Sequence, residues 1–364
     1  MTKRLWRIVA LLFAVTLIAS ACSSDDDGDD DSSDDSSTDE GTTSEGGSLL
    51  DDVISAGTLK CGTRDALPGF AVLNEDGTHT GFDNDFCRAI AAGILGDSES
   101  VDFIDLETDD RFTALQSGEI DVLVRNTTWT AGRDGTEGTT FLQPNFYDGQ
   151  GMMVATDSGY TSLADLAGLV ICSAGGTTSE GNVANEFAAL GLAAPEVLSF
   201  DDTDLLQEAF QAGRCDGWTS DTSQLVGLRS EYPDGPEALT IFDGVFSKEP
   251  LAPGVVDGES AMAQAVDWAV FATIQAEEYG ITQANVDEFL ESEDPNIRTF
   301  LGVEVDGAVF NPGLGLPDDF NYQIVKQVGN YAEIYDRNLA PLELDRGLNQ
   351  LYTDGGLLYS PPYR

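Results

Sequence analysis

Two stretches of the chain, offset by 95 residues, carry the same alternation of strand and helix signals. The first runs from an apolar segment at 58–63, through amphipathic segments at 83–95 and 109–118, to a short apolar run at 120–124. The second repeats this order between residues 169 and 221. Strands separated by helices pair in parallel, so each stretch predicts an open, mostly parallel sheet flanked by helices. The predicted fold class is α/β with two similar lobes.

The two stretches also share residues at matching positions. The pairs are Asp109, Ala114, Gln116, Gly118 and Asp121 in the first stretch and Asp204, Ala209, Gln211, Gly213 and Asp216 in the second. Part of this match is expected from general loop chemistry, because glycine commonly follows a helix. At this offset Asn126 corresponds to Asp221, and both come at the carboxyl ends of equivalent strands. Ligands of open α/β sheets bind at that edge, so Asn126 and Asp221 are expected to face each other across one cleft.

Residues 140–155 and 241–255 are extended, bear Gly and Pro, and flank the second stretch. They predict two paired crossover strands between the lobes. We expect lobe 1 to comprise residues 49–148 and 246–364, and lobe 2 residues 149–245. Asp83 is expected to cap the helix that follows it, and His79 to lie exposed on a hairpin turn.

The N-terminus carries export signals. Residues 1–22 have three basic residues, a short apolar core and small residues before Cys22, which predicts a lipoprotein-type signal peptide with Cys22 lipidated. An ordinary cleaved signal with a chance cysteine is the alternative. Residues 23–48 hold 11 acidic residues and no basic ones, so they predict a disordered, extended tether.

The charge balance excludes some partners. The chain has 17 Lys and Arg against 65 Asp and Glu, a formal net charge of −48. Such a surface repels nucleic acids and anionic membranes, so binding through a broad basic face is not expected.

Four cysteines follow the signal segment, namely Cys61, Cys87, Cys172 and Cys215. An exported protein meets an oxidising space, so two disulfides are expected, and three pairings are possible. Pairing Cys61 with Cys87 and Cys172 with Cys215 would keep each bridge within one compact unit. Metal binding is not expected, because no C-x-x-C spacing occurs and the sole histidine is His79.

An ordered series of motifs resembles a known family. The motifs are GFDNDFCRAIAAGILGD, RFTALQSGEIDVLVRNTTWT, FYDGQGMMV, KEPLAPGV, WAVFATIQAEEYGIT and GLNQLYTDGGLLYSPPYR. From about residue 57 to 364 the chain resembles the extracytoplasmic amino-acid-binding proteins of ABC importers, especially their general L-amino-acid-binding branch. The resemblance implies a two-lobed periplasmic-binding-protein fold, type II-like, whose lobes close on a ligand.

The resemblance also implies site residues. Arg133 would grip the ligand α-carboxylate, for which a planar guanidinium offers two parallel hydrogen bonds. Asn126 and Thr128 would assist it, and Asp221 would accept from the α-ammonium. Thr177 and Thr178 would open a helix whose N-terminus suits an anion. The pocket for the ligand side chain would be lined by Arg64, Leu67 and Thr108. Arg125 is expected instead to neutralise the acidic surface.

The leading functional hypothesis is a receptor that captures free L-amino acids and delivers them to an ABC permease. It would be a monomer without a cofactor or metal, held by its lipid anchor on the outer face of the cytoplasmic membrane or in the periplasm. One alternative is a prephenate- or arogenate-type dehydratase on the same fold, although no catalytic acid or base is evident. Another is a ligand-gated partner of a signalling protein.

Overall fold

A computed structural model describes residues 47–364 of the chain. The predictions for the signal peptide, for Cys22 and for nearly all of the tether therefore lie outside the described residues. Ser48, predicted as the last tether residue, instead caps α1 (Leu49–Ala56): its side chain accepts from Asp51 N, and the Asp51 side chain accepts from Ser48 N. No helix of residues 47–364 is long and apolar enough to cross a bilayer.

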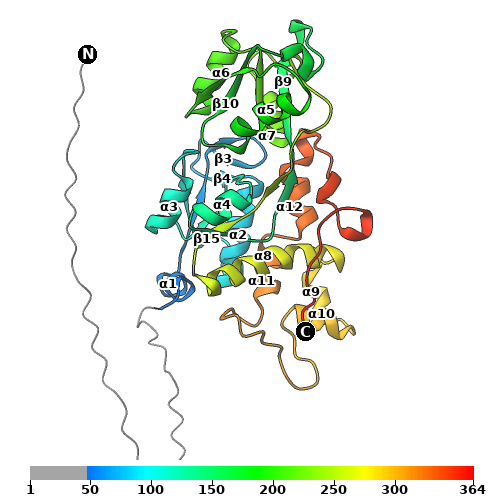
Figure 1. The fold of residues 1–364 in the computed structure, drawn as a ribbon. Coiled ribbons are helices and arrows are strands. Elements are labelled where there is room, and N and C mark those ends of the chain that lie inside the picture. Colours follow the sequence, from blue (N-terminus) through cyan, green and yellow to red (C-terminus); the bar gives the residue numbers. More distant parts are fainter. Residues whose placement is uncertain (1–46) are drawn as a thin grey trace, which may run out of the picture. The chain divides into compact units, whose positions relative to one another are not determined.

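Lobe 1 is built on a five-stranded sheet with the strand order β5-β1-β6-β15-β7. Its strands are β1 (Leu59–Thr63), β5 (Val101–Asp105), β6 (Val122–Leu123), β7 (Thr139–Phe141) and β15 (Gly254–Val256). Strand β1 pairs in parallel with β5 and β6, whereas β15 is antiparallel to β6 and β7. Helices α2 (Phe82–Leu95), α3 (Arg111–Ser117) and α4 (Ala131–Thr136) belong to this lobe, as do the short hairpin strands β2 (Ala66–Leu67), β3 (Ala71–Leu73) and β4 (His79–Thr80) (Figure 1).

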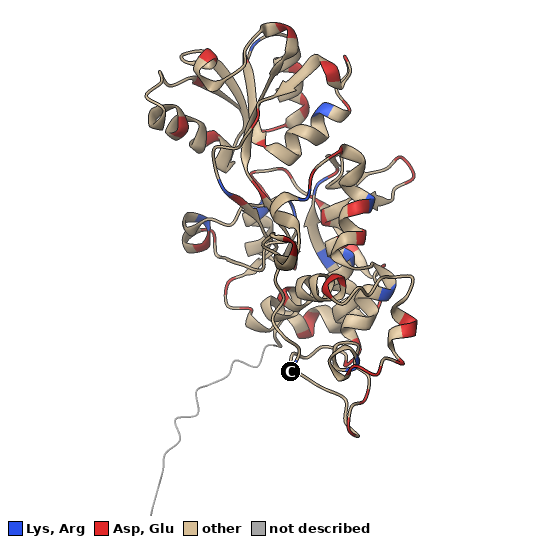
Figure 2. Cartoon of the chain, turned by 90° about the vertical axis from the view of Figure 1, so that its right-hand side faces the viewer, with Lys and Arg blue, Asp and Glu red and all other residues tan. Residues whose placement is uncertain are grey.

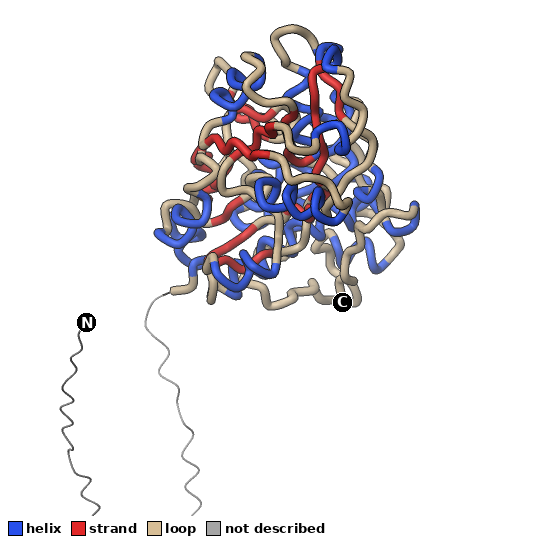
Figure 3. The backbone as a smooth tube through the Cα atoms, turned by 45° about the horizontal axis from the view of Figure 1, so that its top comes forward, coloured by secondary structure: helices blue, strands red, loops and turns tan. Residues whose placement is uncertain are grey.

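Lobe 2 repeats the plan with the strand order β11-β10-β12-β9-β13. The strands are β9 (Gln150–Ala155), β10 (Val170–Ala174), β11 (Glu196–Phe200), β12 (Gly217–Asp221) and β13 (Leu239–Ile241). Strand β10 is parallel to β11 and β12, and β9 is antiparallel to β12 and β13. The helices are α5 (Thr178–Ala189), α6 (Thr203–Gln211) and α7 (Thr222–Ser230). Figure 3 shows strands in both halves of the body, and the prediction of two mostly parallel α/β lobes is confirmed.

The offset of 95 residues corresponds to a structural equivalence. Asp121 and Asp216 each precede the third strand of the repeat, β6 and β12. Asp121 accepts from Lys60 N (2.8 Å) and donates its own N–H to Lys60 O (2.9 Å). Asp216 does the same with Val170, at 3.0 and 2.7 Å. In both lobes, therefore, this aspartate sets the register between the third strand and the first.

Two short antiparallel strands connect the lobes, as predicted. They are β8 (Phe146–Asp148) and β14 (Glu249–Leu251), which pair with each other in a separate two-stranded sheet. The residue-exact boundaries of the lobes stay a prediction.

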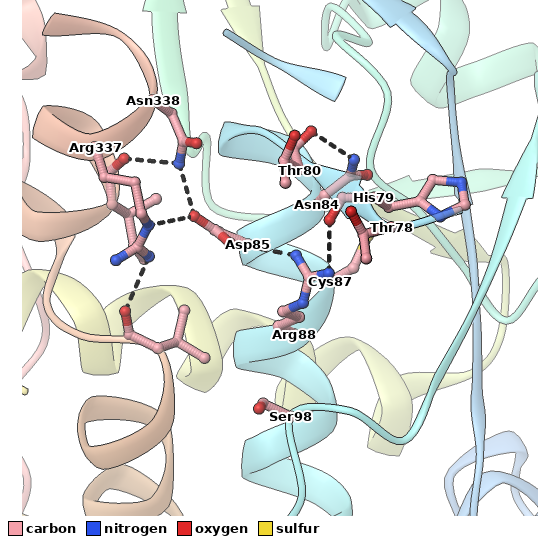
Figure 4. Close-up of polar contacts among 12 residues, drawn as sticks. Thr78, His79, Thr80, Asn84, Asp85, Cys87, Arg88, Ser98, Arg337 and Asn338 are labelled. Carbon is pink, nitrogen blue, oxygen red and sulfur yellow. Dashed lines mark hydrogen bonds and ion pairs between the residues drawn. The ribbon is translucent and has the colours of Figure 1, made fainter. Parts of the chain in front are cut away.

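The C-terminal third adds helices to lobe 1. They are α8 (Ser260–Glu278), α9 (Val286–Phe289), α10 (Pro295–Phe300), α11 (Phe320–Gln327) and α12 (Tyr331–Asn338). Helix α11 packs on α2 and α8, and α12 contacts both of these helices as well. In Figure 4, Asp85 of α2 accepts from Arg337 Nε (2.8 Å) and Asn338 Nδ2 (2.6 Å) of α12. These bonds join segments about 250 residues apart in sequence and fix the last helix to the lobe core.

Both disulfides have the pairing that keeps each bridge in one unit. Cys61 of β1 bonds to Cys87 of α2, and Cys172 of β10 bonds to Cys215, just before β12. They close loops of 26 and 43 residues, for which the chain-entropy model gives roughly 3–4 kcal/mol each. Each bridge therefore stabilises its own lobe. Neither bridge links the two lobes, which are joined only by the chain at the crossover strands.

Asp83 is not the cap of α2, so that prediction is wrong. The helix begins one residue earlier, at Phe82, with Gly81 at the cap position. The Asp83 carboxylate instead accepts from Asn126 N at 3.0 Å. His79 lies on β4 rather than on the turn; it is partly buried, stacks on Phe103 and faces Asp105.

Candidate functional site

A small cavity lies between the two lobes, at the carboxyl ends of their parallel strands. Its free volume is about 30 Å³, room for about two water molecules. Lobe 1 lines it with Arg64, Thr108, Arg111, Arg125, Asn126, Thr128 and Arg133, and lobe 2 with Ala174, Thr177, Thr178, Ser179, Thr203, Ser220, Asp221 and Gln224. A ligand as large as an amino acid needs more room, so its entry requires the lobes or the arginine side chains to move.

Four arginines line the lobe 1 wall of the cavity. The chain is otherwise strongly acidic, and Figure 2 shows Asp and Glu residues in both lobes. Arg64, Arg111 and Arg125 are at most 7% exposed. Burial lowers the pKa of all four arginines, and the neighbouring Arg133 and Arg64 help to bring the pKa of Arg111 to about 9. Like charges that are buried together raise each other's free energy, so this wall favours an anion.

The arginines also reach across to lobe 2. Arg111 Nη2 and Arg133 Nη2 donate to the same carbonyl oxygen, that of Gly176, at 3.3 and 3.1 Å. Arg64 Nη2 donates to Thr203 Oγ1 at 3.4 Å. Gly176 has φ +64°, and a Cβ there would collide with the Asp109 carboxylate of lobe 1. The backbone conformation therefore favours glycine here, and any larger residue would also have to displace the Asp109 side chain.

The lobe 2 wall includes the N-terminal ends of the helices α5, α6 and α7. Thr177 is the N-cap of α5 and accepts from Glu180 N (3.3 Å), so the next residues present a helix terminus to the cavity. Asp221 is the last residue of β12 and the cap residue of α7, but its side chain makes no capping bond.

The charged form of Asp221 is disfavoured in the ligand-free protein. Burial raises its pKa well above the usual value, and the nearby carboxylates Asp148 and Glu249 raise it further, against the opposing effect of Arg133 and Arg111. A cation placed beside Asp221 would relieve this penalty. The cavity therefore has one wall suited to an anion and, facing it, one carboxylate suited to a cation.

Two of the lobe 1 residues that line the cavity have buried polar atoms without a partner among residues 47–364. Both amide atoms of Asn126 and Nε of Arg64 make no hydrogen bond there. Asn126 also has φ +41°, an uncommon backbone conformation for a non-glycine residue. Buried groups of this kind are costly unless something satisfies them, which singles out Asn126 and Arg64 as ligand contacts.

The structure brings together eight of the nine residues suggested for the ligand site. Leu67 is the exception: it is fully buried in the hydrophobic core and does not line this cavity. Its side chain lies instead against Gly227 of α7. The expectation that Arg125 lies on the surface is also wrong, since it is 5% exposed and donates to Leu106 O (2.8 Å) and Thr108 Oγ1 (3.2 Å).

Arg111 is a cavity residue that our sequence reasoning missed. Its Nε donates to Thr108 O at 2.7 Å, which turns the guanidinium toward the cavity wall. A signal was present, because Arg111 is the first residue of α3. A cation at a helix N-terminus opposes the helix dipole, so Arg111 is unfavourably placed for helix stability alone. Arg111 also follows the carboxyl end of β5, the edge of the sheet where ligands bind.

The buried carboxyl groups near the cavity predict how stability depends on pH. Burial raises the pKa of Asp83 to about 7 and that of Asp148 to about 6, from 3.8. The folded state therefore holds protons that the unfolded state releases, and stability is lost as the pH rises through about 6 to 7. Without ligand, we expect unfolding free energy to fall by about 1–3 kcal/mol between about pH 5.5 and 8, measured by urea unfolding. The Asp83→Asn variant should show a shallower fall, and an increase with pH would contradict the assignment.

Family comparison agrees with the fold. Residues 59–289 match the family of bacterial extracellular solute-binding proteins, family 3. The match covers more than half of the chain, and the chain belongs to this family.

Relatives match over almost their whole length. The general L-amino acid-binding periplasmic protein of Rhizobium johnstonii is 44% identical over 318 residues, covering 86% of this chain and 92% of that protein. The glutamate/glutamine/aspartate/asparagine-binding protein of Rhodobacter capsulatus is 42% identical, covering 87% and 94%. A solved periplasmic binding protein from Brucella ovis with glutathione bound superposes with a TM-score of 0.84 at 43% identity, covering 88% and 100%.

Proposed function

We propose that this protein is the amino-acid-binding receptor of an ABC importer. The observation that carries the proposal is the cavity between the lobes, which has an arginine wall on lobe 1 and Asp221 on lobe 2. A zwitterion has charges of both signs a few bonds apart, so it can satisfy both walls at once. It would bridge the lobes and favour the form in which they are closed.

The proposed roles follow from the chemistry of each residue. Arg133 holds the α-carboxylate with two hydrogen bonds, giving up its contacts to Thr128 O and Gly176 O. Asn126 and Thr128 assist from lobe 1. Thr177 and Thr178 add donors at the start of α5. Asp221 accepts from the α-ammonium.

The ligand side chain would meet Arg64, Arg111 and Arg125, with Thr108 at the wall. Three guanidinium groups exceed what one α-carboxylate needs, so we expect a preference for acidic or amide side chains. The names of two relatives support this direction: one binds glutamate, glutamine, aspartate and asparagine, and a solved neighbour holds glutathione, an anionic peptide. The relatives named here are binding proteins, and they lend no support to the dehydratase alternative.

The partners are proposed from the family. The closed receptor would release its ligand to the permease of the importer, acting as a monomer held by a lipid on Cys22. The signal and tether lie outside the described residues, so the anchor rests on the sequence alone. Mass spectrometry of the N-terminal peptide from native membranes would show whether Cys22 is acylated.

Calorimetry with a panel of amino acids tests the proposed function. We expect L-glutamate, L-aspartate and L-glutamine to bind with Kd of about 1 μM or lower, which corresponds to about −8 kcal/mol. D-Glutamate and the deaminated analogue glutarate should bind at least about 100-fold more weakly, because neither places an ammonium on Asp221. Absence of heat across the panel would overturn the proposal, and conversion of prephenate or arogenate would show an enzyme instead.

A further inference from the structure

The two crossover strands end, on the lobe 2 side, in a pair of carboxylates. Asp148 is the last residue of β8 and Glu249 the first of β14, and the two are direct cross-strand partners. Glu249 is 1% exposed. Like charges that face each other across a strand pair are unfavourable, so their placement here calls for compensating contacts.

Glu249 accepts from Ser247 Oγ (2.5 Å) and from two side chains of α5. Its Oε2 accepts from Thr178 Oγ1 (2.9 Å), and its Oε1 accepts from Asn182 Nδ2 (2.9 Å). Thr178 is the first residue of α5, and Asn182 lies one turn further along the same helix. The carboxylate thus accepts two hydrogen bonds from side chains at the start of α5, where the helix dipole favours a negative charge.

Asp148 has the corresponding contacts on α7. One oxygen accepts from Ser223 N (3.3 Å) and Ser223 Oγ, and the other accepts from Gly149 N (2.7 Å). Ser223 is the second residue of α7. Each crossover strand therefore ends in a carboxylate that holds the N-terminal turn of one lobe 2 helix.

The N-terminal ends of both of these helices line the cavity. Thr177 and Thr178 open α5, and Asp221 immediately precedes α7. The chain passes between the two five-stranded sheets through the crossover strands, which form a two-stranded sheet of their own. These strands must therefore change direction when the lobes move. If these strands rotate, Asp148 and Glu249 should move the first turns of α7 and α5 with them.

We propose that Asp148 and Glu249 are positioning residues that fix the first turns of α7 and α5 to the crossover strands and so set the lobe 2 half of the ligand site. This inference rests on the proposed function, because its readout is ligand affinity. Neither residue lines the cavity, and the proposed route of action is the helix that each of them holds.

The test compares L-glutamate affinity in three variants. Glu249→Gln and Asp148→Asn keep side-chain size but lose the charge, and each should raise Kd about tenfold. Asn182→Ala removes one contact of Glu249 without changing any charge, and it should raise Kd about three- to tenfold. In the double variant of Glu249→Gln with Asn182→Ala, we expect Kd to rise by less than the product of the two single increases. Both substitutions disrupt the same contact between Glu249 and α5, so their effects should not be independent.

A matched control separates positioning from general loss of a buried carboxyl. Asp267 is a partly buried carboxylate of α8 that accepts from Gln143 N (2.7 Å) and does not line the cavity. Asp267→Asn should change Kd less than about twofold, even if it lowers Tm. All affinities are measured at a temperature where circular dichroism shows each variant to be folded, so a purely structural role would leave Kd unchanged.

The outcomes are distinct. If wild-type protein binds no panel ligand, the proposed function fails and the inference with it. If wild type binds but Glu249→Gln and Asp148→Asn bind equally well, the inference alone fails. If only the charge-removing variants lose affinity and Asn182→Ala does not, the carboxylates act by charge, and positioning is overturned. Should a carboxylate variant not fold, Asn182→Ala by itself decides the case for Glu249.

Discussion

Replacing Arg133 with alanine is expected to raise the Kd for L-glutamate by at least about 100-fold, which is about 2.7 kcal/mol. Arg133, like Arg111, bonds both to lobe 1, at Thr128 O, and to lobe 2, at Gly176 O. Removing it takes away the proposed partner of the α-carboxylate and a contact that crosses between the lobes. Isothermal titration calorimetry measures the loss directly.

Two further variants make this result specific. Arg133→Lys keeps the charge but not the fork geometry, so its affinity should lie between those of wild type and alanine. Arg214→Ala removes an exposed arginine of lobe 2 that packs over Phe200, and its Kd should match wild type. An Arg133→Ala protein that binds as tightly as wild type would remove this residue from the site and, with it, the assigned orientation of the ligand.

The features predicted correctly from sequence depend on local patterns repeated along the chain. The matching positions of Asp121 and Asp216 predict equivalent strands, and in the structure both residues bond the first strand of their lobe in the same way. The equivalence of Asn126 and Asp221 likewise predicts a shared cleft, because strand ends in parallel sheets are set by the alternation of strand and helix. Glycines 118 and 213 end the matching helices with φ +74° and +69°.

The wrong predictions concern where a side chain points, which local pattern does not determine. Asp83 has the residue type and position of an N-cap, but a tertiary contact with Asn126 N fixes its carboxylate elsewhere. Arg125 looks like a surface charge until the strand end places it between Leu106 and Thr108. Leu67 lies on a two-residue strand and is buried in the core. In a strand, a shift of the register by one residue moves a side chain to the opposite face, here from the cavity wall to the core.

Replacing Asp221 with asparagine should largely remove the preference of the site for L-glutamate over glutarate. The variant keeps the size of the side chain but loses the charge that the α-ammonium would neutralise, so L-glutamate should bind about 100-fold more weakly. Glutarate, which has no ammonium, leaves the buried Asp221 of the wild type without a cation. It should therefore bind the variant at least as tightly as wild type. Competition calorimetry with both ligands measures the two changes together.

The same variant tests the charge state of Asp221. Its pKa is raised by burial and by Asp148 and Glu249, so in the free protein the carboxyl holds a proton to a higher pH than usual. Because the ammonium binds the ionised form, wild-type affinity for L-glutamate should increase with pH through that pKa, and binding should release a proton. Titrations in buffers of different ionisation enthalpy measure this proton. Asp221→Asn should release less of it and show a flatter pH profile; an unchanged profile would mean that another group faces the ligand ammonium.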